Sequence, residues 1–169
     1  IKVAVDENLA LDPDALEKAI KTDLLNGKKP LCVIATIGTT GTTAIDPIKE
    51  IAAVCKKYDI WLHVDAAFAG TALILPEMHY MADGLDMVDS YVFNPHKWMF
   101  TNFDCSAYYV KDKETLIHTF EIMPEYLKTA VDSQVNNYRD WGIALGRRFR
   151  ALKLWFVIRS FGVDGIRER

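Results

Sequence analysis

The chain has 169 residues, of which 50% are hydrophobic and 25% are charged; this balance is typical of a globular protein with a sizeable core and excludes a disordered chain. Its 20 lysines and arginines against 23 aspartates and glutamates give a net charge of −3, which leaves no overall basic field for a nucleic acid or an anionic membrane. No apolar run approaches the roughly 20 residues of a membrane-spanning helix, so we expect a cytoplasmic protein that acts on a small molecule.

The first third of the chain alternates helix and strand signals. Asp12-Pro13 supplies an N-cap followed by proline at the first helical position, and Asn26-Gly27 supplies a stop, which together predict a helix between them. Residues 31–37 form a continuous run rich in branched side chains, which predicts a strand covered on both faces. Asp46-Pro47 repeats the cap-plus-proline pattern and predicts that a second helix begins there.

Three further apolar runs predict the rest of a sheet. Residues 60–65 form a buried strand that ends on Asp65, residues 89–93 form another that leads into Asn94, and residues 105–110 form a returning neighbour. Strands that alternate with helices in this way predict an α/β fold with a largely parallel central sheet flanked by helices.

The last third of the chain has a different texture. Residues 111–140 are polar and predict a long, mobile loop. Residues 143–160 predict a helix that turns one apolar face to the core, and this face consists of Leu145, Phe149, Leu152 and Phe156. The chain lacks an initial Met and ends where a further amphipathic helix begins, so we expect an internal piece of a longer protein.

The three cysteines, Cys32, Cys55 and Cys105, are isolated in the sequence. Their number is odd and their spacing fits neither a disulfide framework nor a zinc site. We therefore expect buried, reduced thiols and no bound metal.

Polar residues follow each of the three predicted parallel strands. They are the pair Thr39-Thr40, Asp65, and the segment from Asn94 to Lys97. Taken singly, each has a structural explanation as a turn residue, a helix cap or a solvated charge. Open α/β sheets bind ligands at the carboxyl ends of their strands, so we expect these side chains to meet at one edge of the sheet.

The combination of Asp65 and Lys97 matches the chemical needs of pyridoxal 5′-phosphate. The aldehyde of this cofactor forms a Schiff base with a lysine, and its ring nitrogen needs an acidic partner to stay protonated. A neighbouring carboxylate raises the pKa of that nitrogen because it favours the charged form. Apolar residues after Lys97 would help its amine to lose a proton.

Three segments then carry a family resemblance, in this order: HVDAAFAG at 63–70, NPHKW at 94–98 and LGRRFR at 145–150. The chain resembles the group II pyridoxal-phosphate-dependent decarboxylases, most of all their aromatic-L-amino-acid branch. The resemblance implies the fold-type I transferase-like architecture and a homodimer. It places the later part of the cofactor-binding large domain at 1–120, a mobile catalytic loop at 121–140, and at 141–169 a helix leading into the C-terminal region.

The resemblance also implies roles for individual residues. Lys97 would form the Schiff base and Asp65 would pair with the pyridine nitrogen. Thr40, Asn94 and His96 would contact the cofactor, with Asn94 near its phosphate.

Tyr126 falls on the family's catalytic loop, where the tyrosine protonates the α-carbon after carbon dioxide leaves. Relatives with phenylalanine at this position tend to form an aldehyde instead, so Tyr126 favours plain decarboxylation of an aromatic L-amino acid to its amine. Phe68 departs from the family, since many members have tyrosine there, and this loss of a hydroxyl leaves the substrate open.

Alternatives remain on the same scaffold and outside it. Trp98 disfavours the glutamate and cysteine-sulfinate decarboxylases, which usually have methionine after the lysine. His96 disfavours the histidine decarboxylases, which usually lack a histidine before the lysine. An aminotransferase or desulfurase would need the same Lys97 and Asp65. Arg147, Arg148 and Arg150 would suit a basic interaction helix, which the negative net charge disfavours. His63, two residues before Asp65, is a candidate for supporting that carboxylate.

Overall fold

The computed structural model describes residues 1–121 and 138–169. The chain divides into two compact units: the first combines Ile1–Tyr109 with Arg150–Arg169, and the second is Val110–Phe149. Within the two described ranges, no helix combines the length and the apolar character needed to cross a bilayer.

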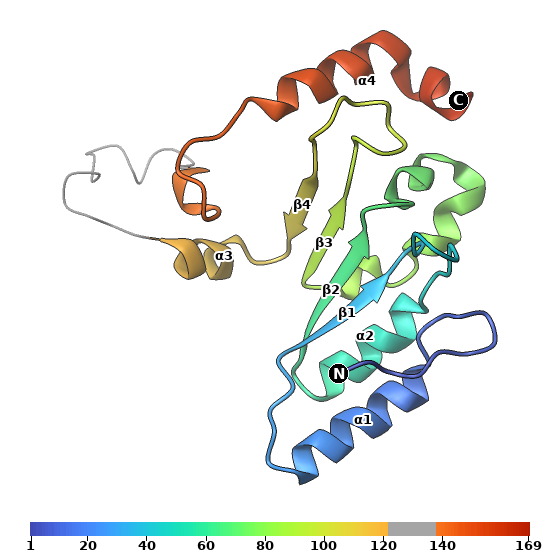
Figure 1. Cartoon of the computed structure of the whole chain (residues 1–169), viewed down its shortest axis with the longest axis vertical. Helices are drawn as coiled ribbons and strands as arrows, with labels where there is room; N and C mark the ends of the chain where they lie inside the picture. Colours follow the sequence, from blue (N-terminus) through green and yellow to red (C-terminus); the bar gives the residue numbers. More distant parts are fainter. Residues whose placement is uncertain (122–137) are drawn as a thin grey trace. The chain divides into compact units, whose positions relative to one another are not determined.

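A four-stranded sheet with the order β1-β2-β3-β4 forms the centre of the first unit (Figure 1). The strands are β1 (Cys32–Thr36), β2 (Trp61–Ala66), β3 (Ser90–Phe93) and β4 (Ala107–Val110). β1 pairs with β2 in parallel, and β2 pairs with β3 in parallel. The chain then turns back through β4 beside β3 (Figure 1). The predicted α/β class with a mostly parallel sheet is confirmed.

Two helices cover one face of this sheet. α1 (Pro13–Leu25) begins where Asp12 accepts hydrogen bonds from the Asp14 and Ala15 amides, as its cap residue predicts. α2 (Ile48–Lys57) buries the four apolar side chains of one helical face, spaced three and four apart. These side chains pack with the alternate strand residues Val33, Ala35, Leu62 and Val64 in one core.

Asp46 does not cap α2, and the sequence-based prediction of its role was wrong. Pro47 is the N-cap residue of α2, and no side chain caps that helix. The Asp46 carboxylate instead accepts from the Leu11 amide with Oδ1 and from the Thr36 amide with Oδ2, each at 2.7 Å. It therefore ties the segment before α1 to the end of β1, a long-range pairing that a local cap pattern does not contain.

β1 is covered on one face only, which corrects the prediction of a fully buried strand. Burial alternates along it, and Ile34 is 63% exposed. The thiol prediction is wrong for Cys32, which is exposed, whereas Cys55 and Cys105 are buried, and all three are free. A continuous run of branched side chains is compatible with a strand buried on one face or on both faces. Composition alone therefore did not distinguish a half-buried strand from a fully buried one.

Short 3₁₀ segments connect β2 to β3, namely η1 (Gly70–Ile74), η2 (Pro76–Ala82) and η3 (Leu85–Met87). Gly70 lies where a Cβ atom would be 2.6 Å from the Phe93 Cβ and 2.7 Å from the Tyr91 hydroxyl oxygen. Only glycine lets η1 approach β3 this closely.

The second unit contains a helix that the sequence interpretation missed. α3 (Lys113–Phe120) lies inside the segment predicted to be loop, and the Asp112 side chain accepts from the Glu114 amide at its start. The helix fully buries none of its residues, and Leu116, Ile117 and Phe120 are partly buried. This short apolar pattern inside a polar segment gave too weak a helix signal. Where the described residues resume, a 3₁₀ turn, η6 (Tyr138–Asp140), contains Arg139 and Asp140, which pair at 3.0 Å.

α4 (Arg150–Arg167) begins later than predicted, and its path bends at Gly162, where φ is 66°. The prediction that its apolar face packs in the core was wrong: Leu145 precedes the helix, and Phe149, Leu152 and Phe156 are exposed. Periodicity identifies an apolar face but not the segment that covers it. Lys153 donates to the Asn102 carbonyl at 2.7 Å.

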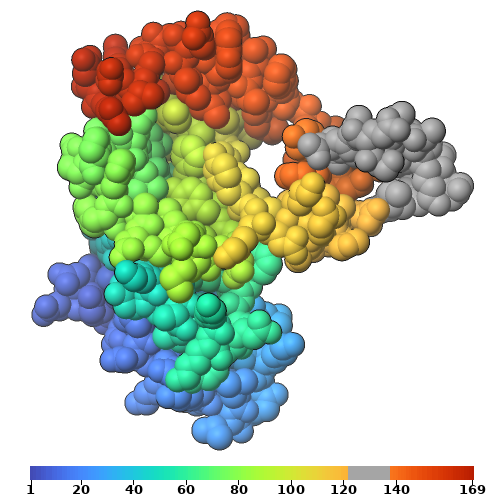
Figure 2. Space-filling view, turned by 180° about the vertical axis from the view of Figure 1, so that it is seen from behind, coloured from blue at the N-terminus to red at the C-terminus, as the bar shows by residue number. Residues whose placement is uncertain are grey.

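The C-terminal end of α4 contacts the segment between β2 and β3, which lies in the same unit. Arg167 donates from Nε to the Ile74 carbonyl at 2.8 Å, and the red end of the helix touches the green segment in the space-filling view (Figure 2). Near the middle of the helix, the rings of Phe100 and Phe161 lie edge to face with centroids 6.1 Å apart.

Candidate active site

The ends of three parallel strands lie level with one another. Thr36 of β1 is the register partner of Asp65 in β2, and Asp65 is in turn the partner of Val92 in β3. The loops that follow these strands therefore leave the sheet at the same edge. The three strand ends thus share one edge of the sheet, as predicted.

The loop after β1 is organised by Thr39. Its hydroxyl lies 2.6 Å from that of Thr42 and accepts from the Ala44 amide at 3.1 Å. Thr40, the predicted cofactor contact, is exposed on the same turn. Gly38 has a φ of +73° and sits where a Cβ atom would be 2.3 Å from the Ala69 Cβ. The loop after β1 is thus packed directly on the loop after β2.

Asp65 is half-buried at the end of β2. Its Oδ1 accepts from the Ala67 amide at 2.9 Å, and its own carbonyl accepts from the Ile37 amide at 3.0 Å. The first bond orients the carboxylate and the second fixes its strand against β1. Side chains two apart on a strand share a face, so Asp65 lies on the sheet face that also carries Trp61 and His63.

Lys97 lies on a closed loop that follows β3. Its amide donates to the Asn94 carbonyl at 2.9 Å, and the Thr101 amide donates to the carbonyl of buried Pro95 at 3.2 Å. His96 Nδ1 lies 2.7 Å from the Cys105 carbonyl oxygen and 2.9 Å from the Cys105 amide nitrogen. His96 therefore joins the outgoing and returning arms of the loop, a role that its sequence position did not indicate.

An aromatic contact brings the loops after β2 and β3 together. The rings of Phe68 and Trp98 meet edge to face with centroids 4.8 Å apart. The Lys97 Nζ lies 5.8 Å from the centre of the Phe68 ring. Phe68 is three residues after Asp65, so the amine-bearing loop contacts the loop that continues from the carboxylate.

His63 has side-chain partners that sequence reasoning did not identify. His63 Nδ1 lies 2.8 Å from the Ser90 Oγ, and Trp61 Nε1 donates to the same oxygen at 2.9 Å. The Tyr108 ring stacks on the imidazole with centroids 6.0 Å apart. The alternation of Trp61, His63 and Asp65 was visible in the sequence, but the strand register that brings Ser90 to His63 was not.

Burial lowers the pKa of His63, and the negative charge of Asp65 acts in the opposite direction. The desolvation of a cationic imidazolium is the larger of the two effects. Burial therefore favours the neutral form of this histidine, against the charge of Asp65.

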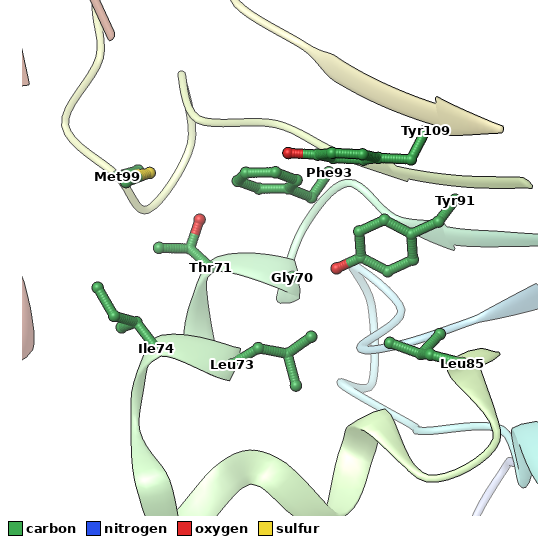
Figure 3. A pocket seen from close by; sticks show the side chains of 9 residues that line it. All are labelled: Gly70, Thr71, Leu73, Ile74, Leu85, Tyr91, Phe93, Met99 and Tyr109. Carbon is green, nitrogen blue, oxygen red and sulfur yellow. The ribbon is translucent and has the colours of Figure 1, made fainter. Parts of the chain in front are cut away.

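An apolar pocket of about 490 Å³ lies on the other face of the sheet (Figure 3). Tyr91 and Phe93 line it, and they alternate along β3 with Val92, the register partner of Asp65. Burial, with a smaller contribution from Tyr109, raises the pKa of Tyr91 to about 12, so its phenol stays protonated. This pocket is therefore separate from the face that carries the Asp65 carboxylate.

Tyr126, predicted to lie on a catalytic loop, is outside the described residues. The structure accordingly places five of the six predicted site residues. Lys97, Asp65, Asn94, His96 and Thr40 all lie at or beyond the carboxyl ends of β1, β2 and β3.

The full length of the chain, residues 1–169, matches the conserved domain described as the pyridoxal-dependent decarboxylase conserved domain. Tyrosine decarboxylase of Papaver somniferum is 48% identical over 169 residues, covering 99% of this chain and 33% of that protein. Histidine decarboxylase of Mus musculus is 48% identical over 162 residues, covering 96% of this chain and 24% of that protein.

Among solved structures, the chain is similar to Oryza sativa TDC with PLP and tryptamine. The TM-score is 0.92 at 42% sequence identity, and the match covers 95% of this chain and 33% of that one. The chain thus spans a third or less of the length of these relatives.

Proposed function

The chain belongs to the pyridoxal-dependent decarboxylase family, and from this premise we propose that it forms the part of a decarboxylase that holds pyridoxal 5′-phosphate and releases carbon dioxide from an aromatic L-amino acid. The observation that carries this proposal is the contact between the loops after β2 and β3. Through Phe68 and Trp98, it brings the amine of Lys97 to the loop that continues from Asp65.

The residues present fit the cofactor. Lys97 is a primary amine on an exposed loop, suited to a covalent bond with an aldehyde carbon. Asp65 is a carboxylate oriented by a backbone amide at a neighbouring strand end, suited to the ring nitrogen. Thr40, Asn94 and His96 lie on the adjoining loops, and we propose that they contact the cofactor, with Asn94 near its phosphate.

When bound, the cofactor supplies an electron-withdrawing ring that accepts the electron pair left by the departing carboxylate. The chain's own residues provide the conditions. Asp65 holds a proton on the ring nitrogen, and Lys97 must release its own proton before its amine can bond to carbon. Phe68 and Trp98 form an aromatic wall beside that amine.

We propose that Tyr126 donates the proton that completes the amine product. A phenol is a suitable general acid when a loop brings it to the reacting carbon. This assignment rests on the family resemblance at Glu125-Tyr126-Leu127.

The aromatic substrate class is the finer part of the proposal. It is supported by Trp98 after the lysine and by relatives named as acting on tyrosine or solved with tryptamine. A relative named histidine decarboxylase is equally identical, so histidine belongs in the test. We also propose a cytoplasmic homodimer, as the family resemblance implies.

The test uses the full-length protein and its Lys97→Ala variant, with Lys29→Ala as the matched control at an exposed lysine. Wild type and Lys29→Ala should show visible cofactor absorbance that borohydride reduces, and Lys97→Ala should lose it. Carbon dioxide release is then measured with tyrosine, tryptophan, dihydroxyphenylalanine, phenylalanine, histidine and glutamate.

Borohydride-reducible absorbance that persists in Lys97→Ala would remove Lys97 from its proposed role. Release from histidine or glutamate but from no aromatic amino acid would overturn the substrate class. A keto acid product without carbon dioxide would identify an aminotransferase.

A further inference from the structure

Ser90 forms the centre of a hydrogen-bonded group on the sheet face that carries Asp65. It is 2% exposed, and its hydroxyl lies 2.9 Å from Trp61 Nε1 and 2.8 Å from His63 Nδ1. An indole nitrogen only donates, so the Ser90 oxygen accepts from Trp61. The buried serine also needs an acceptor for its own proton, and among the described residues His63 Nδ1 lies within hydrogen-bond distance of it, so we take Nδ1 as that acceptor.

This arrangement selects one form of the His63 ring. With Nδ1 as acceptor, the neutral imidazole carries its proton on Nε2. If Nδ1 were protonated, it would donate a hydrogen bond instead of accepting one. The buried Ser90 hydroxyl would then lose the acceptor that the described residues provide for its proton. Losing the acceptor of a buried hydroxyl is costly, so the group opposes a charged His63.

The groups facing His63 come from every strand of the sheet. Asp65 shares its face of β2, and Tyr108 of β4 stacks on its ring. On β1, partial desolvation raises the pKa of the Cys32 thiol, which interacts with the His63 backbone, so the thiol is uncharged near neutral pH although the residue is exposed. Ser90 itself comes from β3, and the carboxylate of Asp89, the residue before this strand, is engaged by the Leu62 amide at 2.7 Å.

We propose that His63 is a positioning residue for Asp65: the Ser90 hydroxyl holds it as the neutral Nε2–H tautomer, so that the Asp65 carboxylate keeps its full charge for the ring nitrogen of the cofactor. This inference rests on the proposed function. It goes further by assigning roles to His63, Ser90 and Trp61, residues that do not themselves contact the cofactor in the proposed function.

The physical reason is electrostatic. A positive imidazolium next to Asp65 would compensate part of the carboxylate charge and would repel a protonated ring nitrogen. Both effects lower the pKa of that nitrogen. A neutral imidazole keeps the site rigid through Ser90 and Tyr108 without adding a competing positive charge.

The first measurement follows the His63 ring by NMR in the cofactor-free full-length protein. In Ser90→Ala, the pKa of His63 should rise by at least about half a unit, because protonation no longer costs the serine its acceptor. Ser106→Ala is the matched control at an exposed serine and should leave the His63 titration unchanged. An unchanged His63 titration in Ser90→Ala contradicts the tautomer assignment.

The second measurement is the dissociation constant of pyridoxal phosphate as a function of pH. In Ser90→Ala, affinity should fall more steeply between pH 8 and pH 6 than in wild type, by up to about threefold for a half-unit rise in the pKa of His63. Adding His63→Asn to Ser90→Ala removes the titrating group and should restore the wild-type pH dependence. His79→Asn, at an exposed histidine, is the matched control and should not restore it.

The outcomes separate this inference from the proposed function. If wild type binds pyridoxal phosphate but Ser90→Ala shows the wild-type pH dependence, the positioning role of His63 is overturned and the proposed function stands. If the double variant retains the pH dependence of Ser90→Ala, the effect does not pass through His63, and the inference also fails. If wild type does not bind the cofactor, both fail.

Discussion

The amine of Lys97 lies beside an aromatic ring. Its Nζ lies 5.8 Å from the centre of the Phe68 ring, and a cation over an exposed ring gains about 0.5–1 kcal/mol. This attraction favours the side-chain position in which the amine lies beside the Phe68 ring. It is weak enough for the amine to leave when it bonds to a carbonyl carbon.

Tyr126→Phe tests the proposed proton donor. The variant keeps Lys97 and Asp65, so we expect the borohydride-reducible absorbance to remain. Without the phenol, protonation of the α-carbon slows, and products should shift from amine toward aldehyde and ammonia. The measurement is chromatographic quantification of amine and aldehyde from the same substrate.

Tyr138→Phe is the matched control for this change, because Tyr138 is an exposed tyrosine at 60%. It should give the wild-type ratio of products. A wild-type ratio in Tyr126→Phe as well would overturn the proton-donor role.

Asp46 connects elements rather than capping one. It is 8% exposed and accepts from amides of residues 11 and 36, which belong to the segment before α1 and to β1. Bonds to a charged acceptor are stronger than neutral ones, and their loss leaves buried amide donors without partners. The carboxylate therefore helps to fix where the N-terminal segment crosses the sheet.

Asp46→Ala should lower the free energy of unfolding by about 3 kcal/mol, the sum expected for two charge-assisted bonds. Urea unfolding of the full-length protein, followed by circular dichroism, gives this quantity. Asp83→Ala is the matched control, because Asp83 forms an exposed pair with Lys49 and such pairs contribute about 0–1 kcal/mol. Equal losses in the two variants would mean that Asp46 has no special linking role.

The whole molecule should respond to acid partly through Glu17. On α1, its carboxylate lies 2.6 Å from Lys57 Nζ, accepts from the Tyr58 hydroxyl at 2.7 Å, and pairs with Lys21 at 3.1 Å. The bond to Lys57 is the largest cause that lowers the pKa of Glu17 from 4.5 to about 2, followed by those to Tyr58 and Lys21. The carboxylate thus joins α1 to α2 only while it is ionised.

The sign of the effect follows from linkage. The folded-state pKa of Glu17 is lower than its unfolded value, so its contribution to stability is fully present above pH 4.5 and is lost as pH falls toward 2. In Glu17→Gln, the midpoint of urea unfolding should therefore depend less on pH between 4.5 and 2 than it does in the wild type. Glu7→Gln, at an exposed glutamate, should keep the wild-type slope, and the same slope in Glu17→Gln would contradict the assignment.

The sequence by itself determined the features that depend on neighbours in the chain. Asp12-Pro13 started α1 where the pattern predicted, because a cap acts within one helical turn. The apolar runs that form β2 and β3 predicted a parallel sheet. A parallel sheet in turn predicted that Asp65 and Lys97 follow their strands at the same edge. α3 was missed because its eight residues give only a short apolar pattern inside a polar segment.

The tertiary structure alone decided which distant groups meet. Strand register brought Ser90 to His63, loop packing brought Phe68 to Trp98, and Asp46 found amides 35 and 10 residues away instead of its own helix. Such contacts are set by the balance of burial and hydrogen bonding over the whole core, which no local pattern encodes. The sequence therefore specified the chemical groups of the site, and packing across the sheet decided how they are held.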